Sequence, residues 1–224
     1  MMETNNQLNI ATLGTISYEK AWDMQQELHA SRIRDEIPDT LLLLEHTPVI
    51  TLGTRGSNDD LLVDTEEITR RGVSIHRATR GGQATLHSPG QLVGYFICNV
   101  RNIERKVRMF VTAIEDSLIQ TLKKYNVDGQ SVQNHPGIWI KDKKIASIGL
   151  SISKATTMHG FALNCTTDLG LFSLLSPCGL EPSQMCSIES IRPSGTECSV
   201  AHVIESYITH GIPSFGYADT VQTT

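Results

Sequence analysis

The run Leu41-Leu42-Leu43-Leu44 constrains the fold more than any other feature of the sequence. Successive residues of a strand point to opposite faces, so a strand of four leucines is apolar on both faces. The run is short and ends near Pro48, which favours a strand over a buried helix. Such a strand needs other structure to cover each of its faces. We therefore expect a β-sheet packed between layers of helix.

Other periodic segments predict helices and strands that interleave without a strict strand–helix–strand repeat. The strongest helix prediction covers residues 106–125, whose apolar residues recur at three- and four-residue steps. Ser17 is a suitable N-cap for an earlier helix over about 18–37. A hairpin is expected where 137–140 and 144–150 flank the polar turn Lys141-Asp142-Lys143. Further predictions are strands at 49–53 and 158–164 and a final helix marked by Val200, Val203, Ile204 and Ile208.

Together these signals predict one α/β catalytic domain over residues 1–224, with a mixed β-sheet flanked by helices. We find no internal repeat and no Pro-, Gly- or Ser-rich linker that would separate two domains. The ordered core is expected to cover about 10–210, and residues 216–224 are expected to form a flexible tail.

Composition excludes several classes of protein. The formal net charge of −5 and the short basic clusters argue against nucleic-acid binding. No run approaches the roughly 18 apolar residues of a membrane-spanning helix, and residues 1–10 lack the pattern of a signal or transit peptide. The five cysteines are an odd number without paired zinc-like spacing, which is typical of free thiols in a reducing compartment. We expect a cytoplasmic monomer without a metal.

The segment from Arg80 to Gln91 concentrates residues that folding alone does not favour. Its paired glycines, Gly81 and Gly82, allow the backbone to approach a ligand closely or to adopt a positive φ. A tight surface loop is the simpler interpretation of a glycine pair. Polar side chains are unusually dense among the glycines, however, which favours a binding loop.

Lys144 and Cys178 are the candidate reactive residues. Lys144 opens an apolar strand, where desolvation would lower the pKa of its amine and make it available as a base. On spacing alone, a solvated lysine remains the favoured interpretation. Cys178 lies between Pro177 and Gly179, which indicates a turn with an accessible thiol.

The other cysteines and the histidines have simpler interpretations. Cys98 and Cys165 lie among apolar residues and are expected to be core side chains. His87, His135 and His159 lie near glycine or proline without a metal-binding motif, so we expect hydrogen-bonded pocket histidines.

Taken together, these segments resemble the lipoyl(octanoyl) transferase family. The family pattern R-G-G-Q-x-T-x-H-G-P-G-Q, K-I-A-S-x-G, H-G-x-A-x-N and N/S-P-C-G is matched in order at residues 80–91, 144–149, 159–164 and 176–179. Residues 45–53 are similar to a further family segment, E-H-x-P-V-x-T-L-G. The sequence departs from the pattern at Ser88, where glycine is usual, and at Leu86, where an aromatic residue is common.

The resemblance implies a fold shared with biotin and lipoate ligases and transfer of octanoate without ATP or another cofactor. It implies that octanoyl-acyl carrier protein is the donor and that lipoyl domains of 2-oxoacid dehydrogenase complexes or the glycine cleavage H protein are acceptors. The implied acyl-carrying nucleophile is Cys178, and the implied general acid and base is Lys144. The implied substrate-binding residues are Arg80, Gly81, Gly82, Gln83, Ala84, Thr85, Leu86, His87, Ser147, Ile148, Gly149, Gly160, Phe161 and Ala162.

Several alternatives remain at this stage. An ATP-dependent lipoate or biotin-type ligase shares the implied fold, but it has no need of Cys178. An amidotransferase that moves octanoate between lipoyl-type proteins keeps the same thiol chemistry and differs in its donor. A thiol hydrolase would pair Cys178 with a histidine, for which His159 is the best candidate. A carrier-protein binding module without activity would not acylate Cys178.

Overall fold

The computed structural model describes residues 7–100, 106–193, 195 and 197–223. Residues 1–6, 101–105, 194, 196 and 224, which the single-domain prediction includes, lie outside this description. An eight-stranded sheet has the order β11-β1-β2-β6-β10-β9-β8-β7, and a three-stranded sheet has the order β4-β3-β5. Both contain parallel and antiparallel pairs, which confirms the predicted mixed sheet. The strands are β1 Gln7–Ile16, β2 Asp39–His46, β3 Val49–Leu52, β4 Ser74–Arg77, β5 Ala84–His87, β6 Gln91–Ile97, β7 Gln130–Val132, β8 His135–Ile140, β9 Lys143–Ser153, β10 Thr156–Asn164 and β11 Asp219–Thr223.

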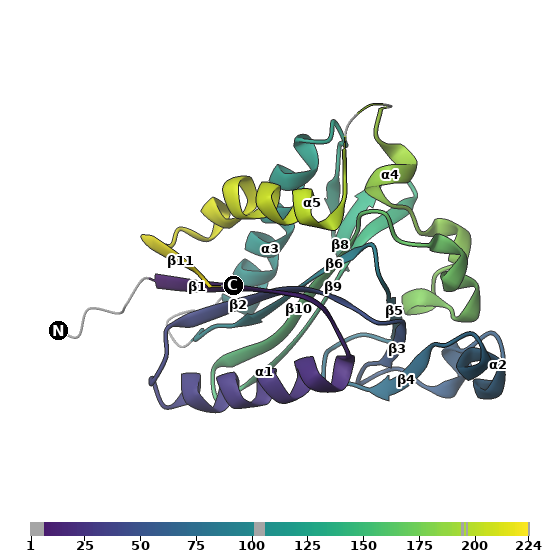
Figure 1. Ribbon diagram of the computed structural model, residues 1–224, viewed down its shortest axis with the longest axis horizontal. Helices are drawn as coiled ribbons and strands as arrows, with labels where there is room; N and C mark the ends of the chain where they lie inside the picture. Colours follow the sequence, from purple (N-terminus) through teal and green to yellow (C-terminus); the bar gives the residue numbers. More distant parts are fainter. Residues whose placement is uncertain (1–6, 101–105, 194, 196, 224) are drawn as a thin grey trace.

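The leucine run lies in β2, between β1 and β6 of the large sheet, and forms the predicted strand that is buried on both faces. Leu41 and Leu43 face the core on one side, and Leu42 and Leu44 face the core on the other. All four are at most 1% exposed. Figure 1 shows the two layers that cover them: α1 (Tyr18–Ile33) lies below the sheet, and α3 (Lys106–Lys123) and α5 (Val200–Ser206) lie above it.

The predicted first helix is confirmed, but it ends earlier than expected. The Ser17 hydroxyl caps the N-terminus by accepting a hydrogen bond from the backbone N–H of Lys20 at 3.3 Å. The helix ends at Ile33 rather than near residue 37, because Asp35 adopts a φ of +56° and Pro38 disfavours helical backbone in the residue before it.

The strongest predicted helix and the predicted hairpin are both present. In α3, the side chains of Phe110, Ile114, Leu118 and Leu122 pack into the core, as their spacing indicates. Val107 is half exposed at the start of the helix, so its apolar character does not signal burial. Strands β8 and β9 form the hairpin and lie under α3, which makes several contacts with β8.

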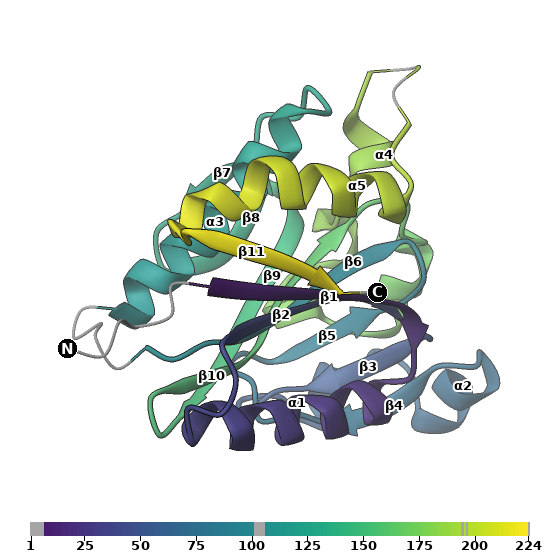
Figure 2. The same cartoon turned by 60° about the vertical axis from the view of Figure 1, so that its left-hand side comes forward.

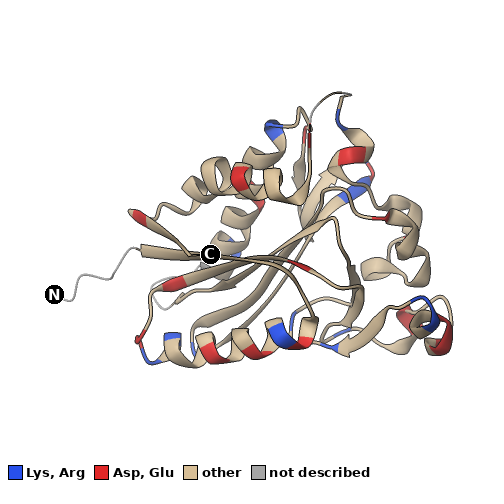
Figure 3. Cartoon of the chain, in the orientation of Figure 1, with Lys and Arg blue, Asp and Glu red and all other residues tan. Residues whose placement is uncertain are grey.

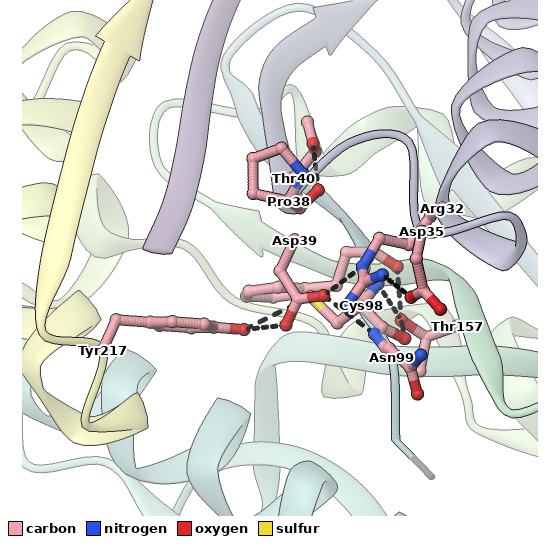
Figure 4. A network of polar contacts seen from close by, with 10 residues as sticks. Arg32, Asp35, Pro38, Asp39, Thr40, Cys98, Asn99, Thr157 and Tyr217 are labelled. Carbon is pink, nitrogen blue, oxygen red and sulfur yellow. Dashed lines mark hydrogen bonds and ion pairs between the residues drawn. The ribbon is translucent and has the colours of Figure 1, made fainter. Parts of the chain in front are cut away.

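The end of the chain differs from the prediction of a flexible tail over 216–224. Strand β11 pairs in parallel with β1, side by side with it in Figure 2. Just before β11, the Tyr217 hydroxyl donates to the Asp39 carboxylate at 2.9 Å, and the same carboxylate accepts from Arg32 at 2.7 Å (Figure 4). Every residue of β11 is exposed, so backbone pairing and the Tyr217 anchor hold the segment without an apolar pattern.

Charged side chains lie mainly on the helices and loops, and the middle of the large sheet is almost free of them (Figure 3). Within the described residues, no helix is long and apolar enough to cross a membrane.

Candidate active site

Cys178 lies in a tight loop between the two sheets. The short 3-10 turn Pro177–Gly179 holds Cys178 at φ 55° and ψ 36°, a left-handed conformation that is costly for a side chain other than glycine. The loop is fixed by hydrogen bonds from Ser176: its backbone N–H donates to the Asp60 carbonyl at 2.7 Å and its hydroxyl donates to the Leu180 carbonyl at 3.0 Å. The Cys178 thiol is partly exposed and its sulfur lies 3.6 Å from the Ala84 carbonyl oxygen.

Lys144 is buried, whereas its neighbour Lys143 is exposed. Only 6% of Lys144 is exposed, and its Nζ lies 5.4 Å from the centre of the Trp139 ring. Burial lowers the pKa of the Lys144 amine, while the nearby Cys178 and Glu115 act in the opposite direction. The solvated interpretation of Lys144 is therefore wrong, and the fold provides a desolvated amine.

Cys178 and Lys144 line the same open pocket, here called the outer pocket. Its wall is formed mainly by the β8–β9 hairpin and the loop at residues 81–83, with further residues from α3 and the Cys178 loop, and none of its described lining residues is acidic. Its lining residues are Arg55, Gly81, Gly82, Gln83, Val107, Val111, Asn134, His135, Pro136, Trp139, Lys144, Ile148, Gly149, Leu150, Cys178 and Leu180.

A second pocket, here called the inner pocket, adjoins the first. The two pockets share Gly81, Gly82, Ile148, Gly149 and Cys178, so the thiol lies where they meet. The lining of the inner pocket is Tyr18, Arg80, Gly81, Gly82, Thr85, His87, Tyr95, Ser147, Ile148, Gly149, His159, Gly160, Phe161, Ala162 and Cys178.

Eleven of the fourteen residues named as substrate-binding line the inner pocket, and three do not. Strand β5 explains two of the exceptions: Thr85 and His87 face the pocket, while the alternating Ala84 and Leu86 pack into a core cluster beneath the small sheet. Gln83 lines only the outer pocket. The fourteen residues that the resemblance implies therefore divide between the inner pocket, the outer pocket and the core.

Two lining residues of the inner pocket, Tyr18 and Tyr95, were not predicted as part of a binding site. Tyr18 is carried by α1 and Tyr95 by β6, and neither lies in a motif rich in polar residues or glycine. His159 also lines this pocket, which agrees with the expectation of a pocket histidine there. It follows that the pocket takes side chains from elements whose local sequence signals only helix or strand.

Arg80 is a buried cation at the junction of the pockets. Its guanidinium donates from Nη2 to the Thr51 carbonyl at 2.5 Å and from Nε to the Thr51 hydroxyl at 3.1 Å. Burial lowers the pKa of Arg80, and the neighbouring Cys178 is the largest influence in the opposite direction. Arg80 therefore places a fixed positive charge near the Cys178 side chain.

A chain of hydrogen bonds connects separate motifs to the backbone of Lys144. His87 Nδ1 lies 2.7 Å from the Gln91 amide oxygen, and the Gln91 amide nitrogen donates to Asn164 at 2.9 Å. Asn164 donates to the Cys186 carbonyl at 2.9 Å, and the Cys186 N–H donates to the Lys144 carbonyl at 3.0 Å. The polar residues of these motifs therefore brace the strand that carries Lys144.

The histidines do not form a base for the thiol or a metal site. His159 stacks on Trp22, lies 3.1 Å from the Thr79 hydroxyl, and has a pKa lowered to about 3 by burial. No described hydrogen bond joins it to Cys178. His135 lines the outer pocket, as expected, but its ring is exposed against Trp139 and makes no hydrogen bond within the described residues. Across the described parts of the chain, no three histidine, cysteine, aspartate or glutamate residues gather as metal ligands would.

Comparisons with known proteins identify the family and the fold of the chain. Residues 17–210 match the lipoyl protein ligase A/B catalytic domain family. An octanoyltransferase of Dictyoglomus thermophilum is 46% identical over 173 residues, which cover 77% of this chain and 73% of that protein. In fold, the chain is similar to a bi-partite lipoate protein ligase of Thermoplasma acidophilum, with a TM-score of 0.73, 14% identity and coverage of 97% and 88%. A biotin protein ligase of Aquifex aeolicus is also similar, with a TM-score of 0.51, 13% identity and coverage of 93% and 69%. The expected likeness to lipoate and biotin ligases is confirmed.

Proposed function

The chain belongs to the lipoyl protein ligase A/B catalytic domain family and is an octanoyltransferase, and we propose that it acts through a thioester on Cys178 with Lys144 as general acid and base. The donor is octanoyl-acyl carrier protein, and the acceptor is a lysine of a lipoyl domain. One observation carries the proposal: a partly exposed thiol and a desolvated lysine line one pocket, and a second pocket adjoins it at the thiol.

The first half-reaction loads the enzyme. Lys144 Nζ accepts the Cys178 thiol proton, and the sulfur attacks the thioester carbonyl carbon of the donor. The bond from that carbon to the carrier sulfur then breaks, and the Lys144 ammonium returns a proton to the departing carrier thiolate. One thioester replaces another, so this half-reaction needs no ATP.

The second half-reaction transfers the acyl group. The free amine of the acceptor lysine attacks the Cys178 thioester, and Lys144 accepts its excess proton. The carbon–sulfur bond breaks, an amide forms, and the proton moves from Lys144 to the released Cys178 sulfur. A single amine with a lowered pKa therefore serves both halves of the cycle.

The inner pocket is the proposed acyl site. Its wall combines apolar side chains, Ile148, Phe161 and Ala162, with glycine backbone, and it adjoins the thiol. Gly160 belongs to this wall, and a Cβ there would lie 2.1 Å from the Gly94 carbonyl oxygen, so the strands pack too closely for a side chain. Burial of six acyl methylenes at ~0.8 kcal/mol each contributes about 5 kcal/mol to binding.

The outer pocket is the proposed entrance for the donor arm and the acceptor lysine. Its open shape and its position beside Lys144 suit two large partners that bind in turn. We further propose that the enzyme acts as a cytoplasmic monomer, which is consistent with five free cysteines.

The test is transfer in the presence and absence of ATP. Purified protein is mixed with octanoyl-acyl carrier protein and an apo lipoyl domain, and the mass of the lipoyl domain is followed. We expect one octanoyl unit to be added at the same rate with and without ATP. Transfer from free octanoate that requires ATP would instead identify a ligase.

A further inference from the structure

Glu115 reaches from α3 toward the strand that supports Lys144. One carboxylate oxygen, Oε1, accepts a hydrogen bond from the backbone N–H of Gly137 in β8 at 3.3 Å. The side chain is partly buried, and burial raises its pKa while Lys144 acts in the opposite direction. The mechanism described above does not use this carboxylate.

Gly137 is the backbone surface against which the Lys144 side chain rests. Its φ is +128°, and a Cβ there would lie 2.6 Å from Lys144 Cε and 3.3 Å from Lys144 Nζ. The pairing of β8 with β9 shifts register between Ile138 and Trp139, right beside this contact. The backbone at Gly137 therefore determines where the lysine amine can lie.

We propose that Glu115 is a positioning residue for Lys144. It anchors Gly137 against the lysine stem through the hydrogen bond, and its negative charge acts on the Cys178–Lys144 pair. The inference rests on the proposed function, because it assigns Glu115 to the support of the same base.

The negative charge of Glu115 shifts the pH dependence of the pair in the same direction whether Cys178 or Lys144 holds the remaining proton. In the fully protonated state of the pair, the thiol is neutral and the lysine is an ammonium. The active form of the pair has one proton fewer than that state. The negative charge of Glu115 stabilises that more positive, fully protonated state. The other titratable groups are Arg55 and His135 in the outer pocket, Arg108 in the pocket that Glu115 lines, and Asp116, whose charge raises the pKa of Glu115. All four stay in place when Glu115 is replaced.

The experiment measures the rate of Cys178 acylation by octanoyl-acyl carrier protein as a function of pH. E115Q keeps an oxygen that accepts from Gly137 but removes the charge, so both limbs of its pH profile should move to lower pH. E115A removes the charge and the hydrogen bond, and its maximal rate should also fall by roughly 10- to 100-fold. D116N is the matched control, because it removes the same charge from the exposed neighbouring residue of α3. Asp116 acts on the pKa of Glu115, so the D116N profile should move much less than that of E115Q.

Thermal unfolding of each variant separates positioning from folding. A pH profile for E115Q that superimposes on those of the wild type and D116N would overturn the inference. The inference would also be overturned if the fall in the acylation rate of E115A were fully explained by its smaller folded fraction. Failure of the wild type to acylate would overturn the proposed function as well, and it is distinguishable because it appears without any substitution.

Discussion

Lys144 holds a buried amine whose desolvation opposes folding. Its pKa is lowered in the folded protein, so the unfolded chain binds its proton more tightly. This cost is fully present below the folded pKa, and it disappears as the pH rises toward the ordinary lysine value. A residue kept at such a cost serves function rather than stability.

Replacement of Lys144 by methionine tests directly whether the buried amine supports activity while lowering the free energy of unfolding. K144M keeps most of the apolar stem against Trp139 and removes the amine, so the acylation rate should fall by roughly 10²- to 10⁴-fold. Its free energy of unfolding at neutral pH, from denaturant titration, should equal or exceed that of the wild type. K143M, which alters the exposed neighbour, should change neither quantity. A K144M protein that is less stable than the wild type, or that still acylates rapidly, would contradict this account.

The resemblance pointed to Cys178 and Lys144 as the candidate reactive residues, whereas no local signal pointed to the residues that support them. Tyr18 and Tyr95 line the inner pocket from a helix and a strand whose sequences indicate only packing. Glu115 looks like an ordinary charged residue on the polar side of a helix. Its proposed role depends on the approach of α3 to β8, and no local sequence pattern predicts that approach.

At the scale of the element, strand β5 divides one motif between two roles. Thr85 and His87 face the inner pocket, and Ala84 and Leu86 face the core. The sequence shows that alternate residues of the strand point to opposite faces, but the motif does not indicate which of the two faces lines the pocket. The same limit applies to α1, whose start was predictable from Ser17 while its end depended on the turn at Asp35.

The substitution L86A separates the two faces of β5. Leu86 is fully buried in the core cluster, so truncation should lower the free energy of unfolding by about 2–5 kcal/mol. The acylation rate of the folded fraction and the preference for acyl-chain length should stay close to those of the wild type. An altered chain-length preference without loss of stability would mean that Leu86 lines the acyl pocket.

The C-terminal segment supports a prediction about anchoring. Tyr217 donates to Asp39, whereas the residues of β11 are exposed. Removal of residues 218–224 should change the free energy of unfolding by no more than about 0.5 kcal/mol, and Y217F should cost about 1 kcal/mol. Equilibrium unfolding compares the two proteins, and a larger loss from the truncation than from Y217F would contradict the assignment of Tyr217 as the anchor.

At the scale of the whole molecule, the two sheets meet around buried neutral histidines. His46 is fully buried, with Nδ1 3.0 Å from the Ile16 carbonyl and Nε2 2.7 Å from the Tyr95 hydroxyl. Burial lowers its pKa to about 4, and lowers that of His159 to about 3. The layered architecture was predictable from the leucine run. The small second sheet, and the contact between its strand β5 and His46 of the large sheet, were not predictable, because they join segments that are distant in the sequence.

These histidines predict a loss of stability in mild acid. The unfolded chain takes up their protons near pH 6.5, while the folded protein does so only near their lowered pKa values. Stability is therefore fully present above about pH 6.5 and falls as the pH is lowered toward 4, by about 3 kcal/mol for His46 alone. Urea unfolding at a series of pH values measures the slope. The control H202Q, at an exposed histidine, should leave the curve unchanged, and a flat curve for the wild type between pH 6.5 and 4 would contradict the prediction.

The most direct test of the account is the mass of the enzyme after incubation with octanoyl-acyl carrier protein alone, without ATP or an acceptor. We predict a gain of one octanoyl unit that is labile to hydroxylamine, maps to Cys178 in peptide spectra, and is lost when a lipoyl domain is added. The C178S variant should show no thioester adduct. A folded wild-type protein that gains no octanoyl unit, or that carries it on another residue, would contradict the thioester mechanism.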